Sequence, residues 1–209
     1  QVEKLPEGNH DPFEIRKTVY RMLAILKALK SVGLNSFLIE SDLEEDSQEA
    51  LKKYIDLRFE LLLIEEGIPQ WIAHNVALGK SDLYESKYQY ALKLAELAKD
   101  DAVRVDIMDT FKRVNNILQK NNIQGASQSV SSNTGTISLV PEEKELHTFI
   151  QEHVGMISPE DMLVLSKILH LFFDKVTVIT DDQNVKARRL NILAQVRDSL
   201  QQYFAISFS

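Results

Sequence analysis

Helix-breaking residues are scarce in this chain, and their placement constrains the fold more than any other feature of the sequence. The 209 residues include seven glycines and five prolines, and these lie between segments in which apolar residues recur every three or four positions. That spacing is the period of an α-helix with one buried face. The pattern predicts an all-α fold, a helical bundle in two parts with a boundary near residue 100.

Capping residues indicate where the expected helices begin and end. Asp11-Pro12-Phe13-Glu14 combines an N-cap, a proline in the first turn and a capping-box glutamate, and predicts a helix that reaches about Ser31. Ser47 is the expected cap of a second helix, which Gly67 and Pro69 end. A shorter helix is expected to follow and to end at about Leu78. Two more are expected over roughly 82–99 and 100–121. Three further helices are expected: one that begins at Pro141, one from Ser158 to about Asp174, and one over roughly 182–203.

Two stretches interrupt the helical pattern. Residues 124–138 carry no charge and little apolar content, so we expect a poorly packed connecting loop there. Val176 to Ile179 is rich in β-branched residues, which favour strands, but no partner strand is evident, and an extended connector is the expectation. No repeat of 20 to 50 residues recurs, which argues against a solenoid.

Composition excludes several classes of protein. The chain is 44% hydrophobic and 26% charged, which is typical of a globular protein. It has no cysteine, which rules out disulfides, zinc–thiolate sites and thiol catalysis and permits a reducing compartment. Its apolar runs are far shorter than the roughly 20 residues that cross a bilayer. Because residue 1 is Gln and no signal peptide is evident, we interpret the chain as a soluble piece of a longer protein.

A search for catalytic and metal-binding motifs supports no such site. There is no phosphate-binding glycine loop, no nucleophile elbow and no zinc-protease motif. His10-Asp11 could be the metal-binding pair of an HD phosphohydrolase, but Asp11 is better explained as a helix cap. The remaining histidines are too far apart to share a helical turn, and the acidic cluster 42–46 lacks the EF-hand pattern. We therefore expect no catalytic residue and no metal site.

Charge is distributed unevenly along an acidic chain. The formal net charge is −7, which argues against a uniformly basic nucleic-acid binder. Residues 1–100 carry 13 basic against 18 acidic residues, and residues 101–209 carry 11 against 13. The second part contains two local runs without an acid, three cations in 112–120 and four in 186–197. Any phosphate contact is expected in these two runs.

The first basic run lies on a helix with two distinct faces. Apolar residues form a stripe on one face: Val103, Ile107, Phe111, Val114, Ile117 and Leu118. The opposite face carries Lys112, Arg113, Asn116 and Lys120. Such cations and an amide could contact phosphates and base edges. Periodicity alone favours an ordinary solvated helix face, so both interpretations stay open at this point.

The second basic run lies on the last expected helix. Its apolar stripe consists of Val185, Leu190, Ile192, Leu193, Val196 and Leu200, with Arg189 at the centre. A guanidinium does not sit unpaired in a core, so we predict that Arg189 forms a structural ion pair with Asp174, at the end of the preceding helix. Lys186 and Arg197 lie on the rim of the stripe and Arg188 points away from it, which makes these three candidates for RNA contact.

Several segments resemble a known family. Phe172-Phe173-Asp174-Lys175-Val176, Val178, Asp181-Asp182, Arg189-Leu190 and Leu193 closely resemble the signature of the DALR anticodon-binding domain of aminoacyl-tRNA synthetases. That motif alone leaves arginyl-, cysteinyl- and glycyl-type enzymes open. Together with Asp11-Pro12-Phe13 and Arg16, Arg58-Phe59 and Glu66-Gly67, and Lys112-Arg113-Val114 with Asn116-Ile117-Leu118, the chain resembles the carboxy-terminal part of the β subunit of bacterial-type glycyl-tRNA synthetase.

The resemblance implies a function and a set of partners. In this family the α subunit uses ATP and Mg²⁺ to activate glycine, while the β subunit captures tRNA-Gly and completes an α2β2 assembly. Residues 1–100 would then be a helical region of the β-subunit body, and 101–209 the anticodon-binding bundle. The chain would need no cofactor of its own, and its partners would be tRNA-Gly, the α subunit or a fused α region, and the rest of the β subunit. It would work in the bacterial cytoplasm or in a plastid, away from membranes.

Two other functions remain compatible with the sequence. An acidic helical scaffold that binds another protein would show no affinity for RNA, whereas phosphate contacts make RNA binding strongly dependent on salt. An HD-type hydrolase would need a bound divalent metal. The expected tRNA-binding residues under the first hypothesis are Lys112, Arg113, Asn116, Lys120, Lys186, Arg188 and Arg197.

Overall fold

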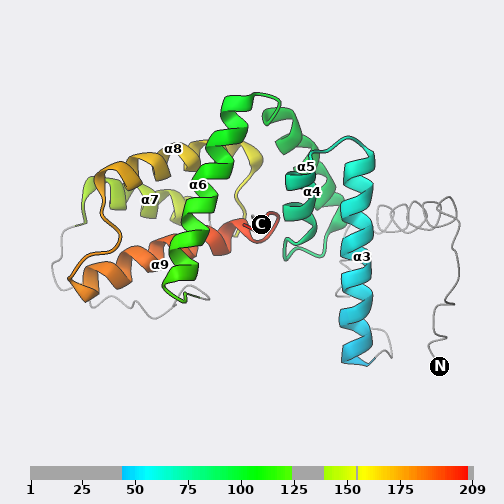
Figure 1. Cartoon of the computed structure of the whole chain (residues 1–209), viewed down its shortest axis with the longest axis horizontal. Helices are drawn as coiled ribbons and strands as arrows, with labels where there is room; N and C mark the ends of the chain where they lie inside the picture. The colour runs from blue at the N-terminus through cyan, green and yellow to red at the C-terminus, as the bar shows by residue number, and fades with distance from the viewer. Residues whose placement is uncertain (1–43, 124–138, 154, 207–209) are drawn as a thin grey trace, which may run out of the picture.

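The computed structural model describes residues 44–123, 139–153 and 155–206, and within these ranges the regular structure is entirely helical. Figure 1 shows the arrangement. The helices are α3 (Glu45–Glu65), α4 (Gln70–Ala77), α5 (Tyr84–Leu97), α6 (Asp101–Lys120), α7 (Pro141–Glu152), α8 (Pro159–Lys175) and α9 (Gln183–Leu200). The predicted all-α fold class is confirmed.

Helix ends follow the capping chemistry in most places. Asp100 caps α6 by accepting a hydrogen bond from the Ala102 N–H at 2.8 Å. Ser158 and Asp161 form a reciprocal capping box at the start of α8, and Asp182 accepts from two backbone N–H groups at the start of α9. The expected cap at Ser47 is wrong: α3 already begins at Glu45, the N-cap position is Glu44, and no side chain caps the helix. The acidic side chains of the first turn, Glu45 and Asp46, instead stabilise the start of the helix through their interaction with the helix dipole.

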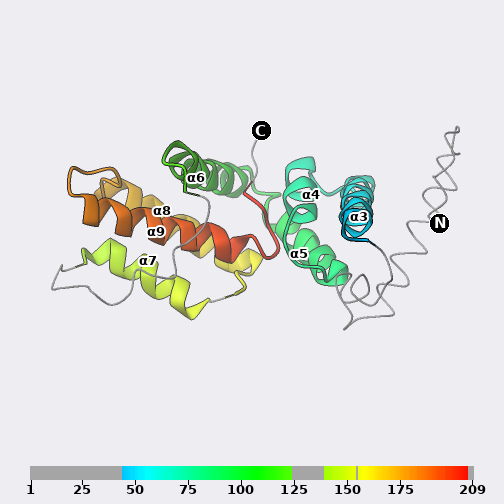
Figure 2. The same cartoon turned by 90° about the horizontal axis from the view of Figure 1, so that it is seen from below.

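The described helices form two groups. Helices α3, α4 and α5 pack in sequence order, whereas α6 to α9 form a bundle in which α8 and α9 each contact both α6 and α7. Figure 2 shows this bundle from below, with α6 on one side of α8 and α9 and α7 on the other. The connector after α8 is extended as expected. Val176 and Val178 are buried while Thr177 and Ile179 are exposed, so the alternation serves the helical core without a partner strand among the described residues.

The segment that follows α9 joins the two groups. The N–H groups of Lys80 and Ser81 donate to the carbonyl oxygens of Gln201 and Gln202 at 2.7 and 2.8 Å, and the Ala205 N–H donates to the Asn75 carbonyl at 2.8 Å. Residues 201–206 therefore run alongside the end of α4. This segment, which we call the C-terminal strap (201–206), brings the last part of the chain back onto the first helical group.

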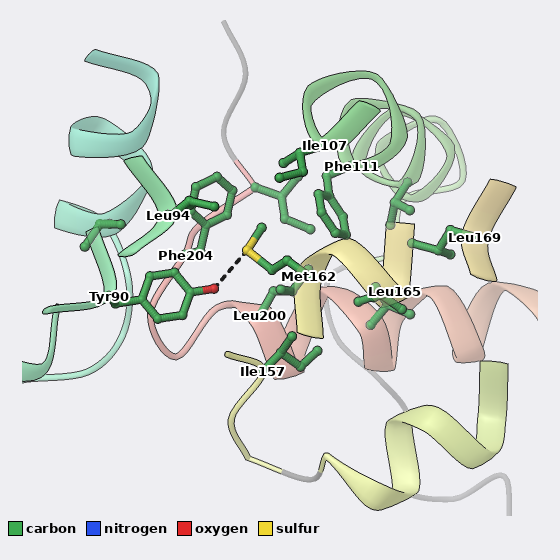
Figure 3. Packing of buried hydrophobic residues seen from close by; sticks show 14 of the residues in the cluster. Tyr90, Leu94, Ile107, Phe111, Ile157, Met162, Leu165, Leu169, Leu200 and Phe204 are labelled. Atoms are coloured by element: carbon green, nitrogen blue, oxygen red, sulfur yellow. Dashed lines mark hydrogen bonds between the residues drawn. The ribbon is translucent and has the colours of Figure 1, made fainter. Parts of the chain in front are cut away.

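Aromatic side chains fill the junction under the C-terminal strap. Phe204 is fully buried and meets the Trp71 ring edge to face, while Tyr203 stacks on Tyr90 with ring centroids 5.5 Å apart. Figure 3 shows the Tyr90 hydroxyl directed at the Met162 sulfur of α8, 2.9 Å away, with Leu94, Leu200 and Phe204 around them. The two groups thus share one continuous core.

Some expectations concern residues that the structure does not describe. The predicted helix at 11–31, the His10-Asp11 pair and the connecting loop at 124–138 all lie outside the described ranges. The domain division at residue 100 also remains a prediction. It coincides with the turn between α5 and α6, although the C-terminal strap crosses it.

A buried lysine holds the first group of helices together. Lys87 of α5 is fully buried, and its ammonium donates to the Ala77 carbonyl at the end of α4 at 2.8 Å. The nearest carboxylate is Asp56 of α3, 3.7 Å from Nζ, and Asp56 also accepts a 2.5 Å hydrogen bond from the Tyr84 hydroxyl. One cation therefore links α3, α4 and α5.

Gly79 provides a test of the C-terminal strap. A Cβ atom at this position would lie 2.8 Å from the carbonyl carbon of Tyr203, a backbone atom that cannot rotate away. We expect Gly79→Ala to lower the free energy of unfolding by about 1–3 kcal/mol, the usual cost of overpacking. Urea unfolding measures the loss, with Leu78→Ala at the exposed neighbouring position as the control. Equal stability of the two variants would contradict the close approach of the strap.

Lys87 predicts a specific dependence of stability on pH. Burial lowers the pKa of its ammonium to about 8, against a partial opposing effect of Asp56, whereas a lysine in the unfolded chain titrates near 10.4. Between these values the unfolded chain binds one more proton at residue 87, so the free energy of unfolding should rise with pH. The free energy of unfolding of the wild type, measured by urea titration relative to that of Lys87→Met, should therefore increase by about 2 kcal/mol between pH 7.5 and 9.5.

The pH window for this comparison ends below pH 10. Burial and the hydrogen bond to Asp56 raise the pKa of Tyr84 above its ordinary value, so the folded chain retains that proton at high pH and stability falls there. Parallel pH profiles for wild type and Lys87→Met below pH 10 would show that Lys87 keeps an ordinary pKa.

Candidate nucleic-acid interface

Helix α6 presents the predicted polar face to solvent. Its apolar stripe is confirmed, because Ile107, Phe111, Val114 and Leu118 are fully buried. Lys112, Arg113, Asn116 and Lys120 are all exposed on the other side. Within the described part of the chain, no carboxylate forms an ion pair with these three cations. We call these four residues the α6 polar face.

A polar network fixes α6 against α8. Asp106 accepts hydrogen bonds from the Ser166 hydroxyl and from His170 Nε2. Thr110, one turn further along α6, lies 2.9 Å from His170 Nε2 and 3.2 Å from the Ser166 hydroxyl. Thr110 and Ser166 are buried, so their hydroxyls satisfy each other in the core. This network fixes where α6 and α8 contact each other, just before the α6 polar face along the chain.

Arg113 of α6 also contacts α8. Its guanidinium carbon lies 4.3 Å from the centre of the Phe173 ring on α8. A cation over an aromatic face is stabilised by about 0.5–1 kcal/mol at an exposed site. The contact places the guanidinium over the ring at an exposed position of α6, where its N–H groups could bind a phosphate or a base.

The second basic run has a different role. Glu143 of α7 is fully buried and forms ion pairs with two successive arginines of α9. Arg188 Nη2 lies 2.6 Å from one carboxylate oxygen, and Arg189 Nε pairs with the other. Arg189 also donates to the Thr177 carbonyl at 2.7 Å. We call these three side chains the Glu143 cluster; it connects α7, α9 and the extended connector before α9.

The predicted ion pair between Arg189 and Asp174 is therefore wrong, although the arginine does sit in a buried pair. Asp174 is exposed at the end of α8. The physical reason is that α7, rather than the end of α8, faces this part of α9, and Glu143 lies in the apolar stripe of α7 three residues before Leu146. Glu143 could have been identified in the same way as Arg189, as a charge within the apolar stripe of its helix.

Two of the predicted RNA-binding arginines form contacts within the protein. The Arg188 guanidinium is committed to Glu143. Arg197 is 8% exposed; it donates to the Ile123 carbonyl at 2.8 Å and pairs with the neighbouring Asp198. Arg197 thus holds the end of α6 against α9. Their side chains are only 12% and 10% exposed, and Lys186 is partly exposed near the start of α9.

Other classes of site find no support in the described ranges. No group of three or more histidine, cysteine, aspartate or glutamate side chains is arranged there to hold a metal ion. None of the described helices is both long and apolar enough to cross a membrane. The α6 polar face is the strongest candidate for a binding surface in this part of the chain.

Comparison with known proteins shows what the bundle is similar to. Residues 107–206 match the family model described as the DALR anticodon binding domain, which covers most of α6 and all of α7, α8 and α9. The resemblance found in the sequence is thereby confirmed for this segment.

Curated relatives extend the similarity to nearly the whole chain. The glycine–tRNA ligase beta subunit of Streptococcus mutans is 28% identical over 200 residues, 92% of this chain and 29% of the relative. That of Hahella chejuensis is 28% identical over 229 residues, 99% of the chain and 32% of the relative. That of Clostridioides difficile is 24% identical over 215 residues, which are 97% of this chain and 31% of the relative. The chain spans about a third or less of the length of these relatives.

The Glu143 cluster can be tested against the partner expected from the sequence. Glu143→Gln removes the carboxylate charge with little change of shape and leaves two partly buried guanidinium groups without a counter-charge. We expect it to lower the free energy of unfolding by about 3–5 kcal/mol. Asp174→Asn, at the exposed position, should change it by no more than about 0.5 kcal/mol. Urea unfolding of both variants decides which carboxylate is Arg189's partner, and similar small losses would contradict the cluster.

Proposed function

We propose that this chain is the tRNA-binding, carboxy-terminal part of the β subunit of a bacterial-type glycine–tRNA ligase. One observation carries the proposal: the bundle that matches the DALR anticodon binding domain, residues 107–206, is the part of the structure that exposes the α6 polar face. The similarity of nearly the whole chain to glycine–tRNA ligase beta subunits supports the same assignment.

The α6 polar face has the chemistry that RNA recognition requires. Lysine ammonium groups and an arginine guanidinium bind phosphate oxygens, and an asparagine amide both donates to and accepts from base edges. The contact between the Arg113 guanidinium and the Phe173 ring reduces the conformational freedom that Arg113 loses on binding. Lys120 lies two turns after Lys112 on the same helix, so the face can follow a strand of several nucleotides.

The division of labour in such an enzyme completes the proposal. Activation of glycine with ATP and Mg²⁺ belongs to the α subunit, and this chain contributes the capture of tRNA-Gly. Its partners are tRNA-Gly, the α subunit or a fused α region, and the rest of the β subunit. The enzyme would work in the bacterial cytoplasm, or in a plastid.

Charge reversal tests the α6 polar face directly. We expect Lys112→Glu/Arg113→Glu to weaken binding of tRNA-Gly at least tenfold and to flatten its dependence on salt, because fewer counterions are released. The melting temperature should stay within a few degrees, since both side chains are exposed. Filter binding or fluorescence anisotropy at two salt concentrations measures the effect.

A matched control separates local contacts from overall charge. Lys53→Glu/Lys99→Glu changes the net charge by the same amount at exposed positions of the first helical group. It should leave tRNA affinity within about twofold if distant charges are screened. Equal losses for both double variants, or salt-tolerant binding of another protein with no RNA affinity, would contradict the proposed function.

A further inference from the structure

His170 of α8 uses one of its two ring nitrogens in the contact with α6. Nε2 pairs with the Asp106 carboxylate and lies 2.9 Å from the Thr110 hydroxyl. In the described part of the chain, Nδ1 has no hydrogen-bond partner. The side chain as a whole is 47% exposed. The ring therefore joins two helices through one nitrogen and has the other left for a ligand.

The contact with Asp106 determines which nitrogen carries the proton. A carboxylate oxygen only accepts hydrogen bonds, so Nε2 must carry the hydrogen that it donates. In a neutral imidazole the other nitrogen then has no hydrogen and is an acceptor. The Asp106 carboxylate also accepts from the hydroxyl of Ser166, which is buried. Asp106 is thus a positioning residue, and Nδ1 of His170 is an acceptor held in a fixed place.

This acceptor lies beside the α6 polar face. Asp106 and Thr110, the two contacts of His170 on α6, precede Arg113 by seven and three residues, so all three share one side of the helix. Arg113 in turn contacts Phe173, which follows His170 by three residues on α8. His170 and Arg113 therefore lie on the same side of the contact between α6 and α8, roughly one helical turn apart.

The charges near His170 favour a hydrogen-bond donor of an RNA over a phosphate at this position. Besides Asp106, the exposed Asp109 follows one turn later on α6, and the exposed Asp174 one turn after His170 on α8. Carboxylates repel phosphate oxygens but tolerate amino and hydroxyl groups. The exposed Lys167 of α8, three residues before His170, adds one cation. Phosphate contacts therefore belong to the cations of α6, and Nδ1 suits a donor.

We propose that the RNA-binding surface of α6 continues onto α8, where Nδ1 of His170 accepts a hydrogen bond from a base amino group or a 2′-hydroxyl of the RNA. The inference rests on the proposed tRNA-binding function. Lysine and arginine only donate, so Asn116 supplies the side-chain acceptor among the four residues of the α6 polar face. Unstacked bases are read along edges that carry both donors and acceptors, and the 2′-hydroxyl marks RNA. A second acceptor at His170 makes such recognition more specific.

Two substitutions of similar shape separate the two nitrogens of His170. A glutamine amide reaches the position of Nε2, so His170→Gln can keep the hydrogen bond to Asp106 but has no acceptor at the position of Nδ1. An asparagine amide reaches the position of Nδ1, so His170→Asn can keep that acceptor but loses the bond to Asp106. The two variants therefore remove the RNA contact and the structural contact one at a time.

Affinity and stability should rank these variants in opposite orders. His170→Gln should weaken binding of tRNA-Gly by about three- to tenfold, the usual effect of losing one hydrogen bond, and unfold in urea close to the wild type. His170→Asn should be the less stable variant and retain more of the affinity. A purely structural role of His170 would give the same order in both measurements and overturn the proposal.

Salt dependence and a second histidine provide controls. Measured at pH 8 with neutral imidazoles, His170→Gln should leave the slope of log affinity against log salt unchanged, because a neutral acceptor releases no counterion, whereas Lys112→Ala should reduce it by about one. His147 is exposed on α7, which lies across α8 and α9 from α6 (Figure 2). His147→Gln should bind tRNA-Gly like the wild type. A reduced slope for His170→Gln would overturn the acceptor role.

An anticodon stem-loop with 2′-deoxynucleotides in its loop identifies the donor. If His170→Gln weakens binding of this RNA as well, a base amino group is the donor; if its effect disappears, the donor is a 2′-hydroxyl. Should His170→Gln bind tRNA-Gly no worse than His147→Gln while Lys112→Glu/Arg113→Glu still weakens binding, the inference is wrong and the proposed function stands. A wild-type chain without RNA affinity would instead remove both.

Discussion

The buried carboxylate of Glu143 is the interaction on which the arrangement of the bundle depends. A charge in the core is tolerated only when partners surround it, and here the two guanidinium groups of Arg188 and Arg189 do so from a single helix. This requirement fixes both the distance and the rotation of α9 relative to α7. Because Arg189 also bonds to the Thr177 carbonyl, the connector that leads into α9 is held by the same cluster.

The position of α9 determines how two neighbouring segments pack. At its far end, the C-terminal strap (201–206) leaves α9 in the direction of α4, and the close approach to Gly79 is possible because that residue has no Cβ. Along its side, Arg197 bonds to the Ile123 carbonyl just after α6. The Glu143 cluster therefore acts indirectly on the α6 polar face, because it holds the helix against which the end of α6 rests. The Asp106 network with Ser166 and His170 fixes α6 at its middle.

The fold class and most helix ends could be predicted because capping and apolar spacing are local signals. Asp100, Ser158 and Asp182 show this, since each caps a helix within two or three residues of itself. The α6 polar face could also be predicted, from periodicity within one helix. The partner of Arg189 could not, because Glu143 is 46 residues away and the pairing depends on which helix faces α9. The course of the C-terminal strap could not be predicted either, because its contacts with residues 75–81 join segments that no local sequence pattern connects.

The structure also explains how an acidic chain can present a basic surface. A run of cations in the sequence is not the same as a patch of cations in space. Of the four in 186–197, Arg188, Arg189 and Arg197 serve internal contacts, which leaves Lys186 as the remaining, partly exposed cation of this run. The run in 112–120 stays on the surface because the opposite side of α6 supplies the core. Charges further away than about 8–10 Å are screened at physiological salt, so the acidic residues of the first helical group contribute little to the local potential. A net charge of −7 is therefore compatible with phosphate binding at α6, since the potential there is set by the side chains of that helix and its immediate neighbours.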